Sequence, residues 1–262
     1  MRDFRRMMTL EPHGPDTYVG TGPSYPWGGL YGGQIVAQAL RACAHTVEPQ
    51  YVVHSLHAFF IRLGDAAEPI RLEVDRIRNG RSFVTRRVVA RQSVGAILNL
   101  AASFHVAEGG AEVQTERMPE VPRPDDLPRD SWSPLMQRCF LRDDIAFGRV
   151  GAWMRFTEDL GDDAILNACA LAYLSDDLPT DAVIAAHPAR PPRGSNERHF
   201  WNASLDHAIW FHRPQRASEW HLHDFTCRGL VGTRGLSFGA IFDLQGRHVA
   251  SVSQEVLLRP LR

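Results

Sequence analysis

The 262-residue sequence predicts an α+β protein of two similar halves, in each of which a long helix packs against an antiparallel β-sheet. Three observations predict this fold class. The second half contains a helical segment that is apolar on nearly every side. The first half contains strand-like segments joined by tight turns, and the two halves match in order at a constant spacing.

Composition and charge exclude several classes of protein. A net charge of −1 and a pI near 6.9 give no electrostatic footprint for nucleic acid or an anionic membrane. All the basic residues counted as lysine or arginine are arginine, which excludes lysine Schiff-base chemistry and a P-loop lysine. We recognise no membrane span and no signal peptide. The four cysteines form no CxxC pair, so we expect a reduced, cytoplasmic protein.

The first helix is predicted from Gly33 to His45. Before it, residues 1–26 are punctuated by proline and glycine, with strand-like pieces only at Met7–Leu10 and Thr17–Val19. Four glycines then precede a periodic apolar run. Glycine at a helix start lets a ligand or another backbone approach the free N–H groups. The alternative is that the glycines allow close packing of the helix on a sheet, and both interpretations remain open here.

A meander of four strands follows this helix. The dipeptide Asn79-Gly80 is a strong hairpin signal, and a second turn is predicted at Ser93–Gly95. Residues 107–134 then become acidic and proline-rich, as in a linker. We therefore expect an N-terminal unit at 1–110, a linker at 111–134 and a C-terminal unit at 135–262 that carries the catalytic site. The expected strands are Val52–Leu63, Ile70–Ile77, Phe83–Arg91 and Ala96–Val106.

The second helix is predicted at Asp162–Asp176, where apolar residues follow a helical period and small apolar residues fill most other positions. A helix that is apolar all round must be enclosed by other elements. Asp162 and Asp163 suit its N-terminal end. Asp176, at the other end, gains nothing from the helix dipole and on its own would be read as a solvated loop residue.

An internal repeat relates the two halves. An offset of 151 residues aligns their strands and turns, and each half has its helix before its sheet. The two closing strands, ILNLAASFHV and HVASVSQEVL, coincide at this offset. The matched pairs are Phe60 with Phe211, Arg62 with Arg213, Glu68 with Glu219 and Gly95 with Gly246.

A long apolar helix wrapped by an antiparallel sheet and duplicated in tandem is the double hotdog arrangement. Six segments, in order from about Gly28 to Arg259, resemble the acyl-CoA thioesterase II (TesB-like) family. The resemblance implies a double hotdog fold and hydrolysis of fatty acyl-CoA to a free acid and CoA. We expect no cofactor and no metal. The segments are YGGQIVAQAL, VHSLHAFFIRLGD, NGRSFVTRRVVARQ, LAYLSD, SLDHAIWFHRP and VASVSQE.

The resemblance also implies three catalytic residues that together activate a water molecule. They are Asp176 of LSD, Ser204 before LDH, where the family often has threonine, and Gln254 of SVSQE. Thioester hydrolysis requires a water that is deprotonated and held near the carbonyl carbon. A partly desolvated carboxylate is a better base, while a hydroxyl and an amide can each donate and accept hydrogen bonds.

Three further residues are expected to contact the substrate: Gly33 and Gln34 at the start of the first helix, and His57 as a polar group lining the acyl site. Free N–H groups at Gly32–Gln34, or at the start of the second helix, could stabilise the oxyanion. The equivalent of the catalytic trio is missing from the first half, where the offset gives Ser103 and Val53 and no carboxylate ends the helix.

Other functions remain as alternatives. The segment GLSFG, Gly235–Gly239, matches the nucleophile-elbow pattern, but the residues after it read as a β-hairpin rather than a helix. A hotdog enoyl-CoA hydratase would need an aspartate–histidine pair, and a silent acyl-CoA-binding protein would not need the trio. We expect acyl-CoA as the ligand, no nucleic-acid or membrane partner, and a homodimer or larger homo-oligomer, because exposed sheet edges pair.

Overall fold

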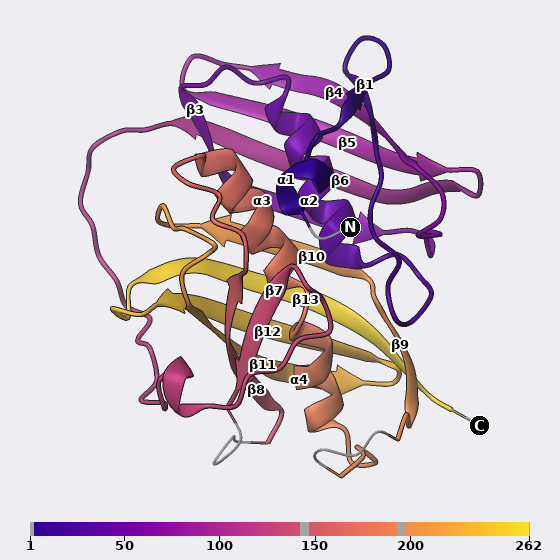
Figure 1. Ribbon diagram of the computed structural model, residues 1–262, viewed down its shortest axis with the longest axis vertical. Helices are drawn as coiled ribbons and strands as arrows, with labels where there is room; N and C mark the ends of the chain where they lie inside the picture. The colour runs from indigo at the N-terminus through magenta and orange to yellow at the C-terminus, as the bar shows by residue number, and fades with distance from the viewer. Residues whose placement is uncertain (1–2, 142–146, 193–196, 262) are drawn as a thin grey trace.

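The computed structural model describes residues 3–141, 147–192 and 197–261, which form one antiparallel sheet with the α-helices gathered on one side (Figure 1). The strand order is β1-β2-β4-β5-β6-β3-β10-β13-β12-β11-β8-β7, and β9 pairs with β13. The helices are α1 (Phe4–Met7), α2 (Gly32–Ala44), the 3-10 helix η1 (Pro124–Asp126), α3 (Ala164–Ser175) and α4 (Pro179–Ala186). The strands are β1 (Glu11–Pro12), β2 (Thr17–Gly20), β3 (Tyr51–Phe60), β4 (Ile70–Asn79), β5 (Phe83–Gln92), β6 (Gly95–Val106), β7 (Met136–Phe140), β8 (Arg149–Phe156), β9 (Phe200–Ser204), β10 (Asp206–Phe211), β11 (His221–Val231), β12 (Arg234–Asp243) and β13 (His248–Pro260).

The first half confirms the predicted helix and four-strand meander, with small shifts at the ends of the elements. Gly80 N–H donates to the carbonyl of Phe83, which closes the hairpin that the Asn-Gly dipeptide predicts. The strand-like interpretation of Met7–Leu10 is wrong, because the chain there leaves the short helix α1. Phe4 and Met7 of α1 are buried in the core, and the Asp3 side chain caps this helix by accepting from the N–H of Arg6.

Helix α3 lies in the middle of the protein, as its apolar composition predicts. All its residues from Leu166 to Ser175 are buried. The Asp163 side chain caps the start by accepting from the N–H of Leu166. Helix α2 packs directly on α3, so the two helices share one core.

The two halves join through strands β3 and β10, which pair antiparallel from Phe59 with Asp206 to Ser55 with Trp210. This pairing makes the sheet continuous across the halves. The segment between β6 and β7 crosses from one half to the other as a long connection that contains η1 (Figure 1). The boundaries expected at residues 110 and 134 stay predictions.

The internal repeat holds, but its spacing changes by one residue at the last turn. Ile61 N–H donates to Ile97, whereas the matching His212 N–H donates to Val249, so the last strands align at 249 − 97 = 152. The added residue follows Gly246, whose positive φ of 79° turns the chain as the φ of 106° at Gly95 does in the first half. The prediction that the offset of 151 continues to the end of the chain is therefore wrong.

Candidate functional site

The candidate site lies where the end of α3 meets the start of α2. Asp176 caps the C-terminal end of α3 and is 7% exposed. A Cβ added at Gly32 would come within 2.6 Å of Asp176 Oδ2, and one at Gly33 within 2.4 Å of the Tyr173 carbonyl oxygen. The two glycines therefore let the start of α2 approach both a carboxylate and another backbone, as the close-approach interpretation predicts, while contact of Gly33 with substrate stays a prediction.

This arrangement explains how a carboxylate is held at the unfavourable end of a helix. The N–H of Gly33 donates to Asp176, so the positive end of α2 faces the carboxylate that the negative end of α3 presents. Burial, with a smaller contribution from the charge of neighbouring Asp177, raises the pKa of Asp176 to about 7. Hydrogen bonds from Gln254, Gly33 and Ser204 act in the opposite direction. Near neutral pH the group can exist in either protonation state, as a general base requires.

The three residues of the predicted trio meet in one chain of hydrogen bonds. Ser204 Oγ lies 3.4 Å from Asp176 Oδ1, as a donor to it. Gln254 Nε2 donates to Ser204 Oγ at 2.7 Å. Ser204 ends β9 and pairs with Val256 of β13, two residues beyond Gln254 on the same strand. Three separate elements thus deliver the carboxylate, the hydroxyl and the amide to one place.

The chain of hydrogen bonds continues through two residues that the sequence analysis did not single out. Gln254 Oε1 lies 2.6 Å from His207 Nδ1, and His207 Nε2 lies 2.9 Å from Ser175 Oγ. His207 and Ser175 are fully buried, and burial lowers the pKa of His207 to about 4. The signal available in the sequence was the position of His207, which directly follows the aspartate of the SLDH segment.

Asp177, beside Asp176, has a separate set of partners. Its Oδ1 accepts from Trp132 Nε1 at 2.6 Å and its Oδ2 from Arg138 at 2.8 Å. Arg138 also donates to Asp130 at 2.7 Å. Asp177 therefore fixes the segment before β7 to the end of α3, and it remains a charge that opposes ionisation of Asp176.

Aromatic rings surround the start of α2. The ring of Tyr31 lies 4.8 Å from that of Tyr173 and 5.0 Å from that of Trp132, and its hydroxyl donates to the Tyr173 carbonyl. The Tyr25 hydroxyl donates to Gln34 Oε1 at 2.7 Å. Gln34, expected to contact substrate, is fully buried and its amide is used within the fold.

His57 lies apart from the other predicted site residues. It sits on β3 between Leu56 and Ala58, which are buried against the helices, so its side chain points to the opposite face of the sheet. There it is exposed and its ring contacts Trp210 at 5.1 Å. The expectation that His57 lines the acyl site is not supported by this position, because strand alternation places it on the outer face.

The first half has no equivalent of the trio, and an arginine fills the corresponding place. With the spacing corrected, Gln254 corresponds to Ala102, while Ser103 faces outward and bonds His54. Ser204 corresponds to Val53, because Val53 pairs with Phe104 as Ser204 pairs with Val256. Where β12 places Ser237 opposite Gln254, β5 places Arg86 opposite Ala102.

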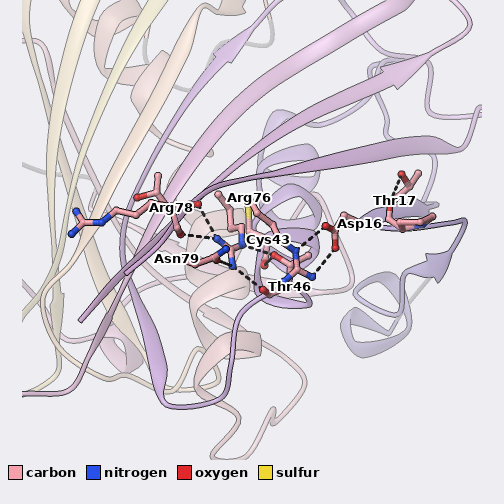
Figure 2. A network of polar contacts seen from close by, with 10 residues as sticks. Asp16, Thr17, Cys43, Thr46, Arg76, Arg78 and Asn79 are labelled. Carbon is pink, nitrogen blue, oxygen red and sulfur yellow. Dashed lines mark hydrogen bonds and ion pairs between the residues drawn. The ribbon is translucent and has the colours of Figure 1, made fainter. Parts of the chain in front are cut away.

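Arg86 is 2% exposed and its guanidinium is bound by neutral oxygen atoms. It donates to the hydroxyl and carbonyl of Thr46, just beyond α2, to the carbonyls of Arg78 and Thr85, and to the Asn79 side chain, at 2.7–3.0 Å. Figure 2 shows three of these acceptor residues, Thr46, Arg78 and Asn79, close to Cys43 of α2. The guanidinium thereby satisfies the Thr46 carbonyl just beyond the helix and two carbonyls of the neighbouring strands.

Ser237 of the GLSFG segment lies within strand β12, followed by a turn and β13, as the hairpin interpretation predicts. It is fully buried, and its Oγ has no hydrogen-bond partner among the described residues. A nucleophile elbow requires a strand–turn–helix context, which this segment lacks. The part of the chain that the structure describes also holds no cluster of three or more metal-ligating side chains and no helix long and apolar enough to cross a membrane.

Family models match both halves of the chain. Residues 21–105 match the acyl-CoA thioesterase N-terminal domain, and residues 115–258 match the acyl-CoA thioesterase C-terminal domain. Among curated proteins, acyl-CoA thioesterase 2 of Haemophilus influenzae is 32% identical, with 88% of this chain and 87% of the relative covered. Human acyl-coenzyme A thioesterase 8 is 31% identical over 97% of this chain and 88% of its own length.

Solved structures give the same result. The chain is similar to the crystal structure of an acyl-CoA thioesterase II, TesB2, from Mycobacterium marinum, with a TM-score of 0.86 and 37% identity over 98% of this chain and 97% of that one. A hotdog-fold protein from Alicyclobacillus acidocaldarius aligns with a TM-score of 0.83 at 19% identity, over 99% and 98% of the two chains. This second likeness concerns the fold alone, which is a double hotdog.

Proposed function

Because the chain belongs to the acyl-CoA thioesterase II family and hydrolyses fatty acyl-CoA to a fatty acid and CoA, we propose that Asp176, Ser204 and Gln254 activate the hydrolytic water. The observation that carries this proposal is the chain of hydrogen bonds from Gln254 through Ser204 to a buried carboxylate. A hydratase would use an aspartate–histidine pair, but the buried His207 bonds Gln254 and Ser175 instead.

In the proposed reaction, Asp176 takes a proton from a water molecule as the water oxygen attacks the thioester carbonyl carbon. Ser204 and Gln254 hold that water, and the positive N-terminal end of α2, which lies next to Asp176, stabilises the negative charge that develops on the carbonyl oxygen. The tetrahedral intermediate collapses with cleavage of the carbon–sulfur bond, and Asp176 returns the proton to the CoA sulfur. No protein nucleophile and no covalent intermediate are needed.

The pH dependence follows from the carboxylate. The base must be ionised, and burial raises its pKa to about 7, so kcat should fall as the pH falls through this region and reach a plateau above it. The measurement is kcat for acyl-CoA hydrolysis from pH 5 to 9, with CoA release followed by a thiol reagent. A flat profile through neutral pH would remove Asp176 as the base.

Replacing the two water-holding residues should affect turnover more than binding. Gln254→Ala and Ser204→Ala are each expected to lower kcat about tenfold or more while KM changes little, because both act on water placement. Ser103→Ala is the matched control, since its hydroxyl faces the opposite side of the sheet and bonds His54. A rise in KM at constant kcat would reassign both residues to substrate binding.

If Ser237 were the nucleophile of a serine hydrolase, its replacement by alanine would abolish hydrolysis. We expect Ser237→Ala to retain hydrolysis, since the buried Oγ has no hydrogen-bond partner among the described residues and no base beside it. A serine-directed fluorophosphonate, followed by intact-mass spectrometry, should leave the wild-type protein unlabelled. Stoichiometric labelling at Ser237 would restore the serine-hydrolase interpretation.

We also propose a homodimer or larger homo-oligomer in the cytoplasm. In support, the sheet face turned away from the helices exposes large apolar side chains in both halves, including Phe59 at 64% and Phe238 at 43%. Multi-angle light scattering tests the assembly, and a mass of 29.4 kDa, that of one chain, would contradict it. Cell fractionation tests the location.

A further inference from the structure

The amide of Gln254 can be placed in two ways, and only one suits the proposed catalysis. Ser204 has one proton. If Gln254 Nε2 donates to Ser204 Oγ, that proton is free to be donated to Asp176. If the amide is turned over, Oε1 faces Ser204 and takes its proton, so the carboxylate loses a donor. Orientation of one amide thus sets the direction of the hydrogen bonds that reach Asp176 from the side chains of Gln254 and Ser204, while the N–H of Gly33 donates in either case.

The group on the far side of the amide is His207, whose Nδ1 lies 2.6 Å from Gln254 Oε1. An amide oxygen only accepts, so Nδ1 must carry a proton when Nε2 of the amide faces Ser204. The imidazole is fully buried and neutral, since burial lowers its pKa to about 4. Its Nε2 is then bare and accepts from the Ser175 hydroxyl at 2.9 Å.

The hydroxyl proton of Ser175 determines which tautomer His207 adopts. Its Oγ lies 2.9 Å from His207 Nε2 and 3.0 Å from the carbonyl oxygen of Ala172, but it has a single proton. Given to His207, this proton supports the Nδ1–H tautomer. Given to Ala172, it leaves Oγ as an acceptor, which requires the Nε2–H tautomer and the reversed amide. In the two tautomers, the hydrogen bonds from Ser175 through His207 and Gln254 to Ser204 therefore run in opposite directions.

We infer that His207, held as the Nδ1–H tautomer by Ser175, is a positioning residue that fixes the amide of Gln254 with its NH₂ group toward Ser204 and Asp176. This inference rests on the proposed function of the trio, because it concerns how Gln254 is oriented. His207 is fully buried behind Gln254 and acts only through it. A second buried histidine on the same face of the sheet, His223, has no hydrogen-bond partner for either ring nitrogen among the described residues.

A matched pair of substitutions tests the role. Asparagine can place an amide donor near the position of Nδ1, whereas leucine has a similar shape and no donor. We expect His207→Leu to lower kcat about tenfold or more at nearly unchanged KM, and His207→Asn to restore kcat to within about threefold of wild type. His223→Leu is the control and should leave kcat unchanged. Equal losses in His207→Leu and His207→Asn would show a packing role and overturn the inference.

The tautomer can be measured without any assay of activity. In protein labelled with ¹⁵N-histidine, long-range ¹H–¹⁵N spectra distinguish a protonated from a bare ring nitrogen, and the signals missing in His207→Asn identify His207. The Nδ1–H form is expected from pH 6 to 9, and an Nε2–H form would overturn the inference. If Asp176→Asn retained activity while the Nδ1–H tautomer was found, the proposed function would fail and the orientation of the amide would stand.

Discussion

Replacing Asp176 by asparagine is expected to lower kcat about a thousandfold while the protein remains folded. The amide has nearly the same shape and keeps one oxygen that can accept from Ser204, but it cannot take a proton from water, and removal of a general base typically costs 10²–10⁴ in rate. The measurement is steady-state hydrolysis of fatty acyl-CoA at pH 8, where the wild-type carboxylate is ionised. Wild-type turnover by the variant would exclude Asp176 from the mechanism.

The same variant has a second expected property, which serves as the control for folding. The pKa of Asp176 is raised from 3.8 to about 7 in the folded protein, so ionisation in the folded state opposes stability. The stability that the protonated group provides is complete below about pH 4 and is lost as the pH rises to 7. At pH 8 the free energy of unfolding of Asp176→Asn, measured by denaturation, should therefore exceed that of wild type by on the order of a few kcal/mol. This difference should vanish near pH 4.

Replacing Arg86 by methionine is expected to destabilise the protein by about 3 kcal/mol or more, because buried oxygen atoms lose their donor. Its guanidinium satisfies the carbonyl and hydroxyl of Thr46, two other carbonyls and the Asn79 side chain, and methionine satisfies none of them. Equilibrium denaturation measures the effect. The substitution lies at the C-terminal end of α2, whereas Asp176 lies beside its N-terminal end. The kcat per folded molecule should therefore not change.

Arg87→Met is the matched control for this prediction. Arg87 is the next residue on the same strand, but its side chain faces solvent and pairs with Asp75 on the surface. Since exposed ion pairs contribute little, this substitution should change the free energy of unfolding by no more than about 1 kcal/mol. If the two variants lost the same stability, the buried hydrogen bonds of Arg86 would not be the source of its effect.

Local sequence signals predicted most of the fold because each of them depends on neighbouring residues. The apolar run of α3 requires enclosure, and the Asn79-Gly80 dipeptide requires a tight turn, whatever the rest of the chain does. The family resemblance brought Asp176, Ser204 and Gln254 forward as a set, and the structure places them within one hydrogen-bonded chain. Their catalytic role stays a prediction.

The parts that were missed depend on contacts between distant residues. No pattern near Gly33 shows that its N–H donates to a carboxylate at position 176, and none near His207 shows that its ring meets Gln254. His57 was misplaced because a strand sequence rich in apolar residues on both faces does not show which face is buried. Met7–Leu10 was read as strand-like, whereas Met7 ends the short helix α1, which is stabilised by burial of Phe4 and Met7 in the core.

The meeting of α2 with α3 has a consequence for the history of the gene. The site takes its backbone glycines from one copy of a duplicated unit and its side chains from the other. Because both halves belong to one polypeptide, every molecule contains the glycines of the first half and the catalytic side chains of the second in a one-to-one ratio. The first copy then needs no carboxylate of its own and can hold Arg86, while a side chain at Gly32 or Gly33 would still clash with the second copy's part of the site. The two copies therefore evolve under different constraints, and expressing either one alone would yield half of a site.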